Sequence, residues 1–368
     1  MLAEIHEMRK KLRHVLRTPK RWEGNLRRSA LARAIRGSNI IEGYRVAEDD
    51  AAAALDDAEP ISADERTFLE IQGYRHALGY VLAMGEEDYS TFDSTEIRAM
   101  HYMMLRHEPS KSPGRYRKGP VFVHDDRTDR VVYEGPDAAN VPALMETLVE
   151  SLHAEPEIDP IVRSAMAHLN LVMIHPFRDG NGRMARALAT SVLTRSDIGE
   201  PEFSSIEEWL GANTEDYYSA LALTGHGSWR PRDDANLWLS FNLRAHHMQA
   251  QTVARRIEEA GVTWSELDAL IAEHLLPERS IDAMFEAVLG YRVRRAGYLK
   301  RTGVEDQTAT RDLAALANAG VLVAHGSGRG RFYTAGEPLQ RIQQGRRARR
   351  TPLADPYPWM RPHLATAP

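Results

Sequence analysis

The sequence predicts a mainly α-helical protein with one β-hairpin inside its helical part and a smaller second domain near its C-terminal end. Three observations support this fold class: helical spacing over most of the chain, one pair of β-prone runs, and a change of pattern after residue 260. Apolar residues recur every three or four positions, as on one face of an amphipathic helix. Helices are therefore expected at 1–18, 24–41, 64–84, 93–106, 138–154, 160–174, 182–195, 215–223 and 234–259.

The composition is that of an ordinary globular protein and excludes several classes. The chain has 368 residues, of which 43% are hydrophobic and 27% charged, with a formal net charge of −5. It contains no cysteine, which excludes a disulfide framework and thiolate chemistry. Charges interrupt residues 1–22, so no signal peptide is expected, and no apolar stretch is long enough to span a membrane. We expect a cytoplasmic protein without a membrane partner.

The β-prone runs are Val121-Phe122-Val123 and Val131-Val132-Tyr133. A polar segment containing Asp125, Asp126 and Asp129 separates them, which is the pattern of a β-hairpin.

A second domain begins where the helical pattern changes, between residues 263 and 280. Helices are expected at 281–289, 293–302 and 306–319, followed by β-prone runs at 321–323 and 331–333 around a glycine-rich loop. Three helices followed by a hairpin are the layout of a winged helix, so residues 261–340 are predicted to form a winged-helix-like domain. Residues 341–368 are rich in Arg and Pro and are predicted to be a flexible tail.

The segment from Ile174 to Arg186 carries the clearest chemical pattern. Gly180-Asn181-Gly182 directly precedes an apolar helix, where backbone N–H groups and the helix dipole together favour an anion such as a diphosphate. Arg183 and Arg186 lie three residues apart on one helix face, and guanidinium groups bind phosphate oxygens in a bidentate manner.

Two further residues complete this pattern. Asp179 offers a hard oxygen ligand for a Mg²⁺ ion that bridges phosphates, and the imidazole of His175 could take a proton from an attacking hydroxyl. The alternative is a solvated loop with a structural histidine and a glycine cap. The whole combination has a chance probability on the order of 10⁻¹⁰ per window, which disfavours that alternative.

The segment HPFRDGNGRMAR resembles the Fic signature, H-x-F-x-(D/E)-G-N-G-R-x-x-R, without departures. The preceding helix at 165–174 and the segment Pro113-Gly-Arg-Tyr-Arg117 are also similar to this family, and the resemblance covers roughly residues 30–250. It implies a helical catalytic core, placed here at 91–260, that binds ATP with Mg²⁺. Such a core transfers AMP to a Ser, Thr or Tyr hydroxyl of a protein substrate, and pyrophosphate leaves.

The resemblance also implies a role for each residue of the motif. His175 is the general base and Asp179 is the Mg²⁺ ligand, while Phe177 anchors the loop in the core. Asn181 and the backbone of Gly180 and Gly182 hold the α- and β-phosphates. The distal phosphates are assigned to Arg183 and Arg186.

Two features outside the motif gain a role from the same resemblance. The hairpin from Val121 to Tyr133 would be a flap that clamps a target segment as an added edge strand, although a decorative hairpin would look the same. Tyr217 and Tyr218 are similar to tyrosines beside the adenine in this family. Their alternative interpretation is that of core aromatic residues on a helix face.

The N-terminal region, residues 1–90, contains a second motif. The segment from Ser38 to Gly43 resembles the Fic inhibitory motif, (S/T)-x-x-x-E-(G/N). Ser38 and Glu42 share a helix face, Gly43 is expected to permit close approach to another backbone, and Glu42 is expected to meet Arg186. The alternative is an ordinary helix end with a solvated glutamate, because such a pattern occurs on the order of 10⁻³ times per window.

The charge balance of the second domain raises DNA binding as an alternative function. The domain carries few acidic residues, and a recognition helix could read base edges with Gln307, Thr308, Thr310 and Arg311. The basic residues are Arg292, Arg294, Arg295, Lys300, Arg301, Arg311, Arg329, Arg331, Arg341, Arg346, Arg347, Arg349 and Arg350. Winged helices also bind proteins or form homodimers, which is the other interpretation of this domain. The alternative function of the chain is that of a DNA-binding regulator with a nucleotide-sensing core. A positioned histidine favours an enzyme.

Overall fold

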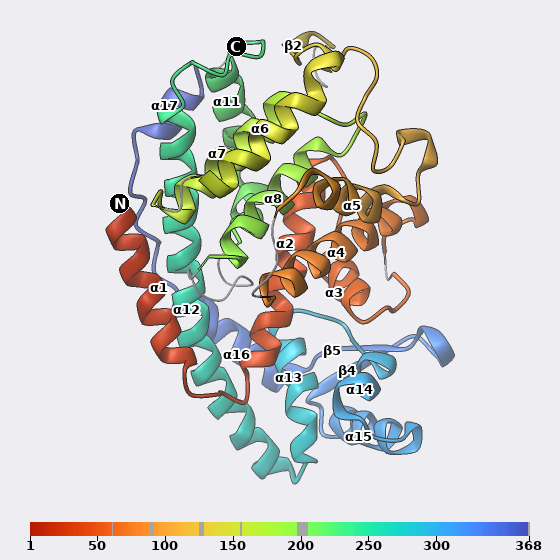
Figure 1. The fold of residues 1–368 in the computed structure, drawn as a ribbon. Helices are drawn as coiled ribbons and strands as arrows, with labels where there is room; N and C mark the ends of the chain where they lie inside the picture. The colour runs from red at the N-terminus through yellow and green to blue at the C-terminus, as the bar shows by residue number, and fades with distance from the viewer. Residues whose placement is uncertain (61, 88–91, 125–128, 155–156, 197–204, 367–368) are drawn as a thin grey trace.

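A computed structural model describes residues 1–60, 62–87, 92–124, 129–154, 157–196 and 205–366. The protein is mainly helical with a two-stranded hairpin, as the sequence predicts, and this part also has a three-stranded sheet (Figure 1).

Up to residue 134, the described part of the chain contains five α-helices, one 3₁₀ helix and the hairpin. They are α1 (Leu2–Leu16), α2 (Glu23–Ile41), α3 (Glu48–Leu55), α4 (Glu65–Gly85), α5 (Ser94–Leu105), η1 (Pro109–Lys111), β1 (Phe122–His124) and β2 (Val131–Glu134). Helix α3 was not predicted. Asp64 and Asp93 begin α4 and α5 by accepting hydrogen bonds from backbone N–H groups in the first turn.

The middle of the chain forms the helices around the signature segment. They are η2 (Ala138–Asn140), α6 (Val141–Ala154), α7 (Pro160–Ile174), α8 (Asn181–Thr194), α10 (Glu207–Ala212), α11 (Thr214–Gly225) and α12 (Asn236–His274). Helix α8 lies at the centre, in contact with α2, α4, α5 and α7, and its residues Met184, Ala185, Ala187 and Leu188 are fully buried (Figure 1).

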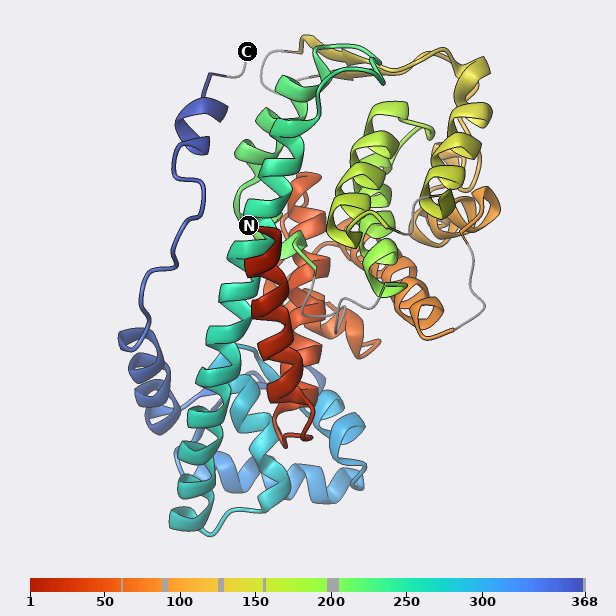
Figure 2. The same ribbon diagram turned by 60° about the vertical axis from the view of Figure 1, so that its left-hand side comes forward.

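Helix α12 is longer than the sequence predicts and joins the two parts of the molecule. Its apolar spacing continues through Ile257, Trp264 and Leu267, all of which are buried, so the helix does not end where the pattern was expected to change. It extends from the helices around α8 to the C-terminal domain, with α1 beside it (Figure 2).

The C-terminal domain has the predicted order of elements with one difference. Its elements are η3 (Glu278–Ser280), α13 (Ile281–Leu289), β3 (Val293–Arg294), α14 (Arg295–Thr302), α15 (Asp306–Asn318), β4 (Leu322–His325), η4 (Gly328–Gly330) and β5 (Phe332–Ala335). Val293 was expected in a helix but pairs with Tyr333 in a sheet of order β3-β5-β4. The winged-helix interpretation stays a prediction.

Helix α2 belongs to two hydrophobic cores. Trp22, which directly precedes it, and Leu26 pack with apolar residues of α12 and the C-terminal domain. Ala32, Ala34 and Ile35 of the same helix pack in the core that surrounds α8. One continuous helix therefore connects the C-terminal domain to the signature segment.

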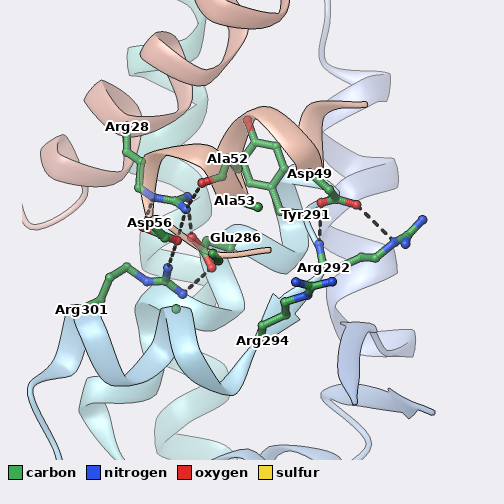
Figure 3. A pocket seen from close by; sticks show the side chains of 12 residues that line it. Arg28, Asp49, Ala52, Ala53, Asp56, Glu286, Tyr291, Arg292, Arg294 and Arg301 are labelled. Atoms are coloured by element: carbon green, nitrogen blue, oxygen red, sulfur yellow. Dashed lines mark hydrogen bonds and ion pairs between the residues drawn. The ribbon is translucent and has the colours of Figure 1, made fainter. Parts of the chain in front are cut away.

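Ion pairs reinforce this connection around a cavity of about 30 Å³ between α2, α3 and the C-terminal domain (Figure 3). Arg28 of α2 contacts Glu286 of α13 at 2.8 Å and Asp56 at 2.5 Å, and Arg301 of α14 contacts Glu286 at 2.6 Å. Close by, Arg292 contacts Asp49 at 3.2 Å.

Many basic residues of the C-terminal domain thus have acidic partners. Lys300 pairs with Asp57, and Arg346 and Arg350 both pair with Glu259. Most of the carboxylates that pair with these basic residues lie before residue 261 in the sequence. Counting charges within the domain alone therefore does not reveal that the basic residues are paired. The side chain of Arg329 is outside the described side chains.

The C-terminal segment differs from the expected flexible tail. Residues 337–348 form α16 (Glu337–Ala348), and a short α17 (Met360–Leu364) follows. Met360 and Leu364 are buried, and Asp355 pairs with Arg244 of α12 at 2.7 Å. These contacts order a segment whose composition alone suggests mobility.

Within the described ranges, no helix combines the length and apolar character that crossing a bilayer requires.

Candidate functional site

His175 ends helix α7 and is held in one orientation. Its backbone has a left-handed conformation (φ 52°), and its N–H donates to the carbonyl of Leu171. The ring Nδ1 lies 3.1 Å from the carbonyl oxygen of Val172. A carbonyl only accepts hydrogen bonds, so Nδ1 carries the proton and Nε2 has a free lone pair. Burial lowers the pKa of His175, which keeps the ring neutral and able to accept a proton.

The loop after His175 is anchored from inside the protein. Phe177 is fully buried and its ring stacks on that of His101, with 3.8 Å between the ring centroids. The Asn181 side chain accepts a hydrogen bond from the Phe177 N–H (2.9 Å) and donates to the Phe177 carbonyl (3.0 Å). The Asn181 side chain therefore holds the loop closed and is not free, in this conformation, to contact a phosphate as expected. The backbone N–H of Asn181 remains for the phosphate contact.

Helix α8 begins at Asn181, directly after a turn that requires glycine. Gly180 has φ 75°. The first N–H groups of an α-helix have no partner within the helix, so those of Asn181, Gly182 and Arg183 form the positive end of α8. A side chain at Gly182 would place its Cβ 2.5 Å from Glu42 Oε1, so the Glu42 carboxylate lies over this helix end.

Arg186 connects this helix end to α2. It is 1% exposed, and it donates from Nε to Ser38 Oγ (2.8 Å) and from Nη2 to Glu42 Oε1 (2.6 Å). Burial alone would lower the pKa of Arg186, but the Glu42 carboxylate together with Tyr217 and Tyr74 outweighs burial and raises it. Nη1 has no hydrogen-bond partner within the described part and lies beside Gly182. A buried, unsatisfied guanidinium donor at a helix N-terminus suits a further anionic ligand.

Arg183 points away from Arg186, although the two share a helix face. It is buried and forms an ion pair with Glu70 of α4, and the guanidinium lies 5.7 Å from the centre of the Tyr44 ring. Burial raises the pKa of Glu70, but its hydrogen-bond partners and Arg183 outweigh burial and lower it to about 2. Arg183 would have to leave this partner to reach a phosphate, because its long side chain extends toward α4 and that of Arg186 toward α2.

Asp179 lies at the mouth of the site and is partly exposed. Its Oδ1 accepts the Gly180 N–H at 2.8 Å, and its Oδ2 lies 3.1 Å from Lys111 Nζ. Among the described residues there is no group of three or more His, Asp or Glu side chains arranged to hold a metal. A single carboxylate next to a phosphate-binding helix end nevertheless fits Mg²⁺, which keeps several waters and binds substrate phosphates.

The end of α2 is shaped by glycines. Gly43 has φ 84°, and a Cβ there would meet no atom within 4 Å, so this glycine serves the turn and not a close approach. The close approach occurs at Gly37, where a Cβ would overlap the carbonyl of Glu207 in α10. Tyr218 also holds this helix end by donating to the carbonyl of Ile41 at 2.8 Å.

Tyr217 and Tyr218 have different surroundings. Tyr217 is buried among Trp238 and Phe241, and its hydroxyl lies 2.9 Å from Nε2 of His168. This is the core position that the sequence left open as the alternative. The ring of Tyr218 is about half exposed.

The hairpin lies beside the end of α7. Strands β1 and β2 pair with Phe122 opposite Glu134 and Val123 opposite Tyr133. Phe122, Val131 and Val132 are exposed, whereas Tyr133 is buried and its hydroxyl donates to the carbonyl of Met173 at 2.6 Å. Val121, just before β1, accepts the Gly135 N–H at 3.1 Å.

Glu207 is a buried carboxyl near Arg186, and its burial is expected to make the stability of the protein depend on pH. Burial raises its pKa to about 7 from 4.5, although it accepts a hydrogen bond from Tyr74 at 2.6 Å. The folded state therefore holds this proton more tightly than the unfolded chain. The resulting stability is present below pH 4.5 and is lost as the pH rises toward 7, on the order of 3 kcal/mol. Glu207→Gln should reduce this loss between pH 5 and 7.5 in urea unfolding, and an unchanged pH dependence would contradict it.

The sequence did not single out several residues that hold the site together. They are Glu70, His101, Lys111, Gly37 and Glu207. Arg117 lies in the segment at 113–117 that resembles the family, so the sequence pointed to this segment, but no role was assigned to Arg117.

The region that contains this site is similar to known proteins. Residues 91–193 match the Fic/DOC family. The chain is 32% identical over 171 residues to a protein adenylyltransferase Fic of Nematostella vectensis, covering 44% of this chain and 35% of that protein. It is 29% identical over 245 residues to protein adenylyltransferase fic-1 of Caenorhabditis elegans, covering 63% and 43%. The chain thus spans less than half the length of these relatives.

Solved structures show the same fold. A Fic family protein from Desulfovibrio desulfuricans superposes with a TM-score of 0.57 at 23% identity, covering 91% of this chain and 94% of that one. A Fic domain containing signaling protein from Bacteroides thetaiotaomicron superposes with a TM-score of 0.59 at 20% identity, covering 70% and 98%. Residues 91–193, which hold His175 and the start of α8, thus match the Fic/DOC family in sequence, and the chain has the fold of Fic proteins.

Proposed function

We propose that this protein transfers AMP from ATP to a Ser, Thr or Tyr hydroxyl of a protein target. The main observation behind the proposal is that a neutral His175 with a free Nε2 precedes an anion-binding helix start by a few residues. The adenylyltransferase names of the relatives point to the same chemistry.

The proposed transfer step uses these residues as follows. The target hydroxyl oxygen attacks the α-phosphorus of ATP, the bond from this phosphorus to the bridging oxygen breaks, and pyrophosphate leaves. His175 Nε2 takes the hydroxyl proton. The N–H groups at the start of α8 and Arg186 hold the phosphates, and Asp179 would hold Mg²⁺, which supplies neutralising charge.

We also propose that Glu42 inhibits this reaction. Its carboxylate takes one donor of Arg186 and covers the helix end at Gly182, where the outer phosphates of ATP would lie. A carboxylate and a phosphate are anionic acceptors for the same guanidinium, so they compete. ATP bound beside Glu42 would present its α-phosphorus in the wrong direction for the attacking hydroxyl.

The exposed hairpin is the proposed site for the target. Phe122, Val131 and Val132 present apolar side chains, and a two-stranded sheet can accept a further strand at its edge. The main chain of the target would then lie beside the end of α7.

The proposal is tested by incubating the purified protein and a lysate with labelled nucleotides. AMP transfer predicts that protein bands gain label from ATP labelled at the α-phosphate and none from ATP labelled at the γ-phosphate. Parallel reactions with GTP, CTP and UTP identify the donor. Label from the γ-phosphate alone would indicate a kinase and contradict the proposal.

DNA binding by the C-terminal domain is a second candidate. Gln307, Thr310 and Arg311 at the start of α15 are exposed, as a recognition helix requires, although the ion pairs described above neutralise much of the basic charge.

Arg311→Ala tests this candidate and leaves the domain in place. Removing the whole domain would expose the core that it shares with Leu26 of α2. If the domain binds a duplex, this variant should bind more weakly in fluorescence anisotropy and lose affinity less steeply with salt. No binding by the intact protein would favour an interaction with proteins.

A further inference from the structure

The carbonyl groups at the end of α7 are all in use. His175 takes those of Leu171 and Val172, as described, and Tyr133 of the hairpin donates to that of Met173. The next three carbonyls, at 174–176, accept hydrogen bonds from one residue, Arg117. A helix normally leaves its last carbonyls without partners in the helix, so these donors determine how the helix ends.

Arg117 binds the base-bearing turn and both ends of the hairpin at once. Its Nε donates to the His175 carbonyl at 2.8 Å, and Nη2 reaches the Ile174 carbonyl at 3.4 Å. Nη1 donates to the Gly119 carbonyl before β1 at 2.8 Å, and Nη2 to the Pro136 carbonyl after β2 at 2.5 Å.

The surroundings of Arg117 suit its guanidinium and no other side chain. The residue is 8% exposed, and all of its described hydrogen-bond acceptors are backbone carbonyls. A planar group with donors in three directions can serve these separate segments, whereas a lysine ammonium cannot span them. Gly135 adds to the fit, because a Cβ there would lie 3.3 Å from Arg117 Nη2.

We propose that Arg117 is a positioning residue that fixes the hairpin relative to His175, so that a segment bound to the hairpin presents its hydroxyl to Nε2. This inference rests on the proposed AMP transfer. Apart from the backbone carbonyl of His175, Arg117 has no described hydrogen bond to the residues proposed to bind the nucleotide or to the exposed strand residues. Its effect therefore falls on transfer to a protein acceptor, and much less on ATP binding or on transfer to water.

The test compares Arg117→Lys with Arg115→Lys, both in the Glu42→Gly background. Arg115 is exposed two residues away and serves as the matched control. For Arg117→Lys we expect kcat with a protein or peptide acceptor to fall on the order of 10²-fold, as for other small misplacements. The KM for ATP and the slow release of AMP to water should stay within a few-fold, and Arg115→Lys should match its parent.

A merely structural role would lower acceptor transfer and hydrolysis together, in proportion to the folded fraction, and that result would overturn the proposal. Tyr133→Phe removes only the parallel hydrogen bond to Met173 and provides a milder variant if Arg117→Lys does not fold; it should show the same split to a smaller degree.

Hydrogen exchange keeps this inference separate from the proposed activity. In Arg117→Lys, amides of the hairpin at 121–124 and 131–135 should exchange faster while those of α8 stay unchanged. If the Glu42→Gly parent transfers no AMP, the proposed function fails, whereas unchanged exchange of the hairpin overturns the role of Arg117 itself.

Discussion

Replacing Glu42 by glycine is expected to raise automodification by on the order of 10²-fold over the wild-type protein. The Glu42 carboxylate lies 2.6 Å from Arg186 Nη2 and over the first turn of α8, where we propose that the outer phosphates of ATP bind. Its removal frees Arg186 and the helix end for ATP, which can then align its α-phosphorus with an incoming hydroxyl. Labelling with α-labelled ATP measures the gain.

The Glu42→Gly/His175→Ala double variant is the control, and it should be silent because the freed site lacks its base. Glu42→Gln separates charge from shape: it keeps an acceptor near Arg186 but loses the competition between anions, so we expect an intermediate gain. Glu42→Gly should also lower the thermal midpoint, since Arg186 is left buried without its carboxylate. Equal labelling by folded wild-type and Glu42→Gly proteins would mean that Glu42 is an ordinary helix-end residue.

Replacing His175 by alanine should reduce transfer by about 10²–10⁴-fold while ATP still binds. The imidazole donates from Nδ1 to the Val172 carbonyl and is proposed to use Nε2 for the proton of the hydroxyl, so it has no part in holding phosphate. The variant should be made in the Glu42→Gly background, where activity is high enough to measure the loss. Nucleotide binding is followed by calorimetry.

His226→Ala controls for the loss of a left-handed residue at a helix end, because His226 ends α11 with φ 46° but is exposed. It should transfer AMP as its parent does. Transfer by His175→Ala close to the parent level would show that another group takes the proton.

Local patterns predicted much of the candidate site. The spacing of apolar residues predicted most helices before α12 to within a few residues, and the glycine before α8 predicted a helix start that suits anions. The expected contact between Glu42 and Arg186 is present, although 144 positions separate the two residues. The contact was predicted because residues 38–43 match the inhibitory motif of the family and residues 175–186 match its signature, both without departures.

The partners of each side chain could not be predicted in the same way. Arg183 and Arg186 share a helix face, yet α4 supplies Glu70 to the first and α2 supplies Ser38 and Glu42 to the second. Asn181 uses its amide to close the loop, and Tyr217 lies in the core. The basic excess of the C-terminal domain is reduced by carboxylates such as Asp57 and Glu259, which are distant in sequence. These outcomes depend on tertiary packing, which a single sequence does not display.

We propose that Glu42 restrains an AMP-transfer site at the start of α8. The most direct measurement is the intact mass of purified wild-type and Glu42→Gly proteins after incubation with ATP and Mg²⁺. We expect Glu42→Gly to gain the mass of one or more AMP groups and the wild-type protein to gain little or none. A gain of phosphate, or an equal gain of AMP by both proteins, would contradict the account.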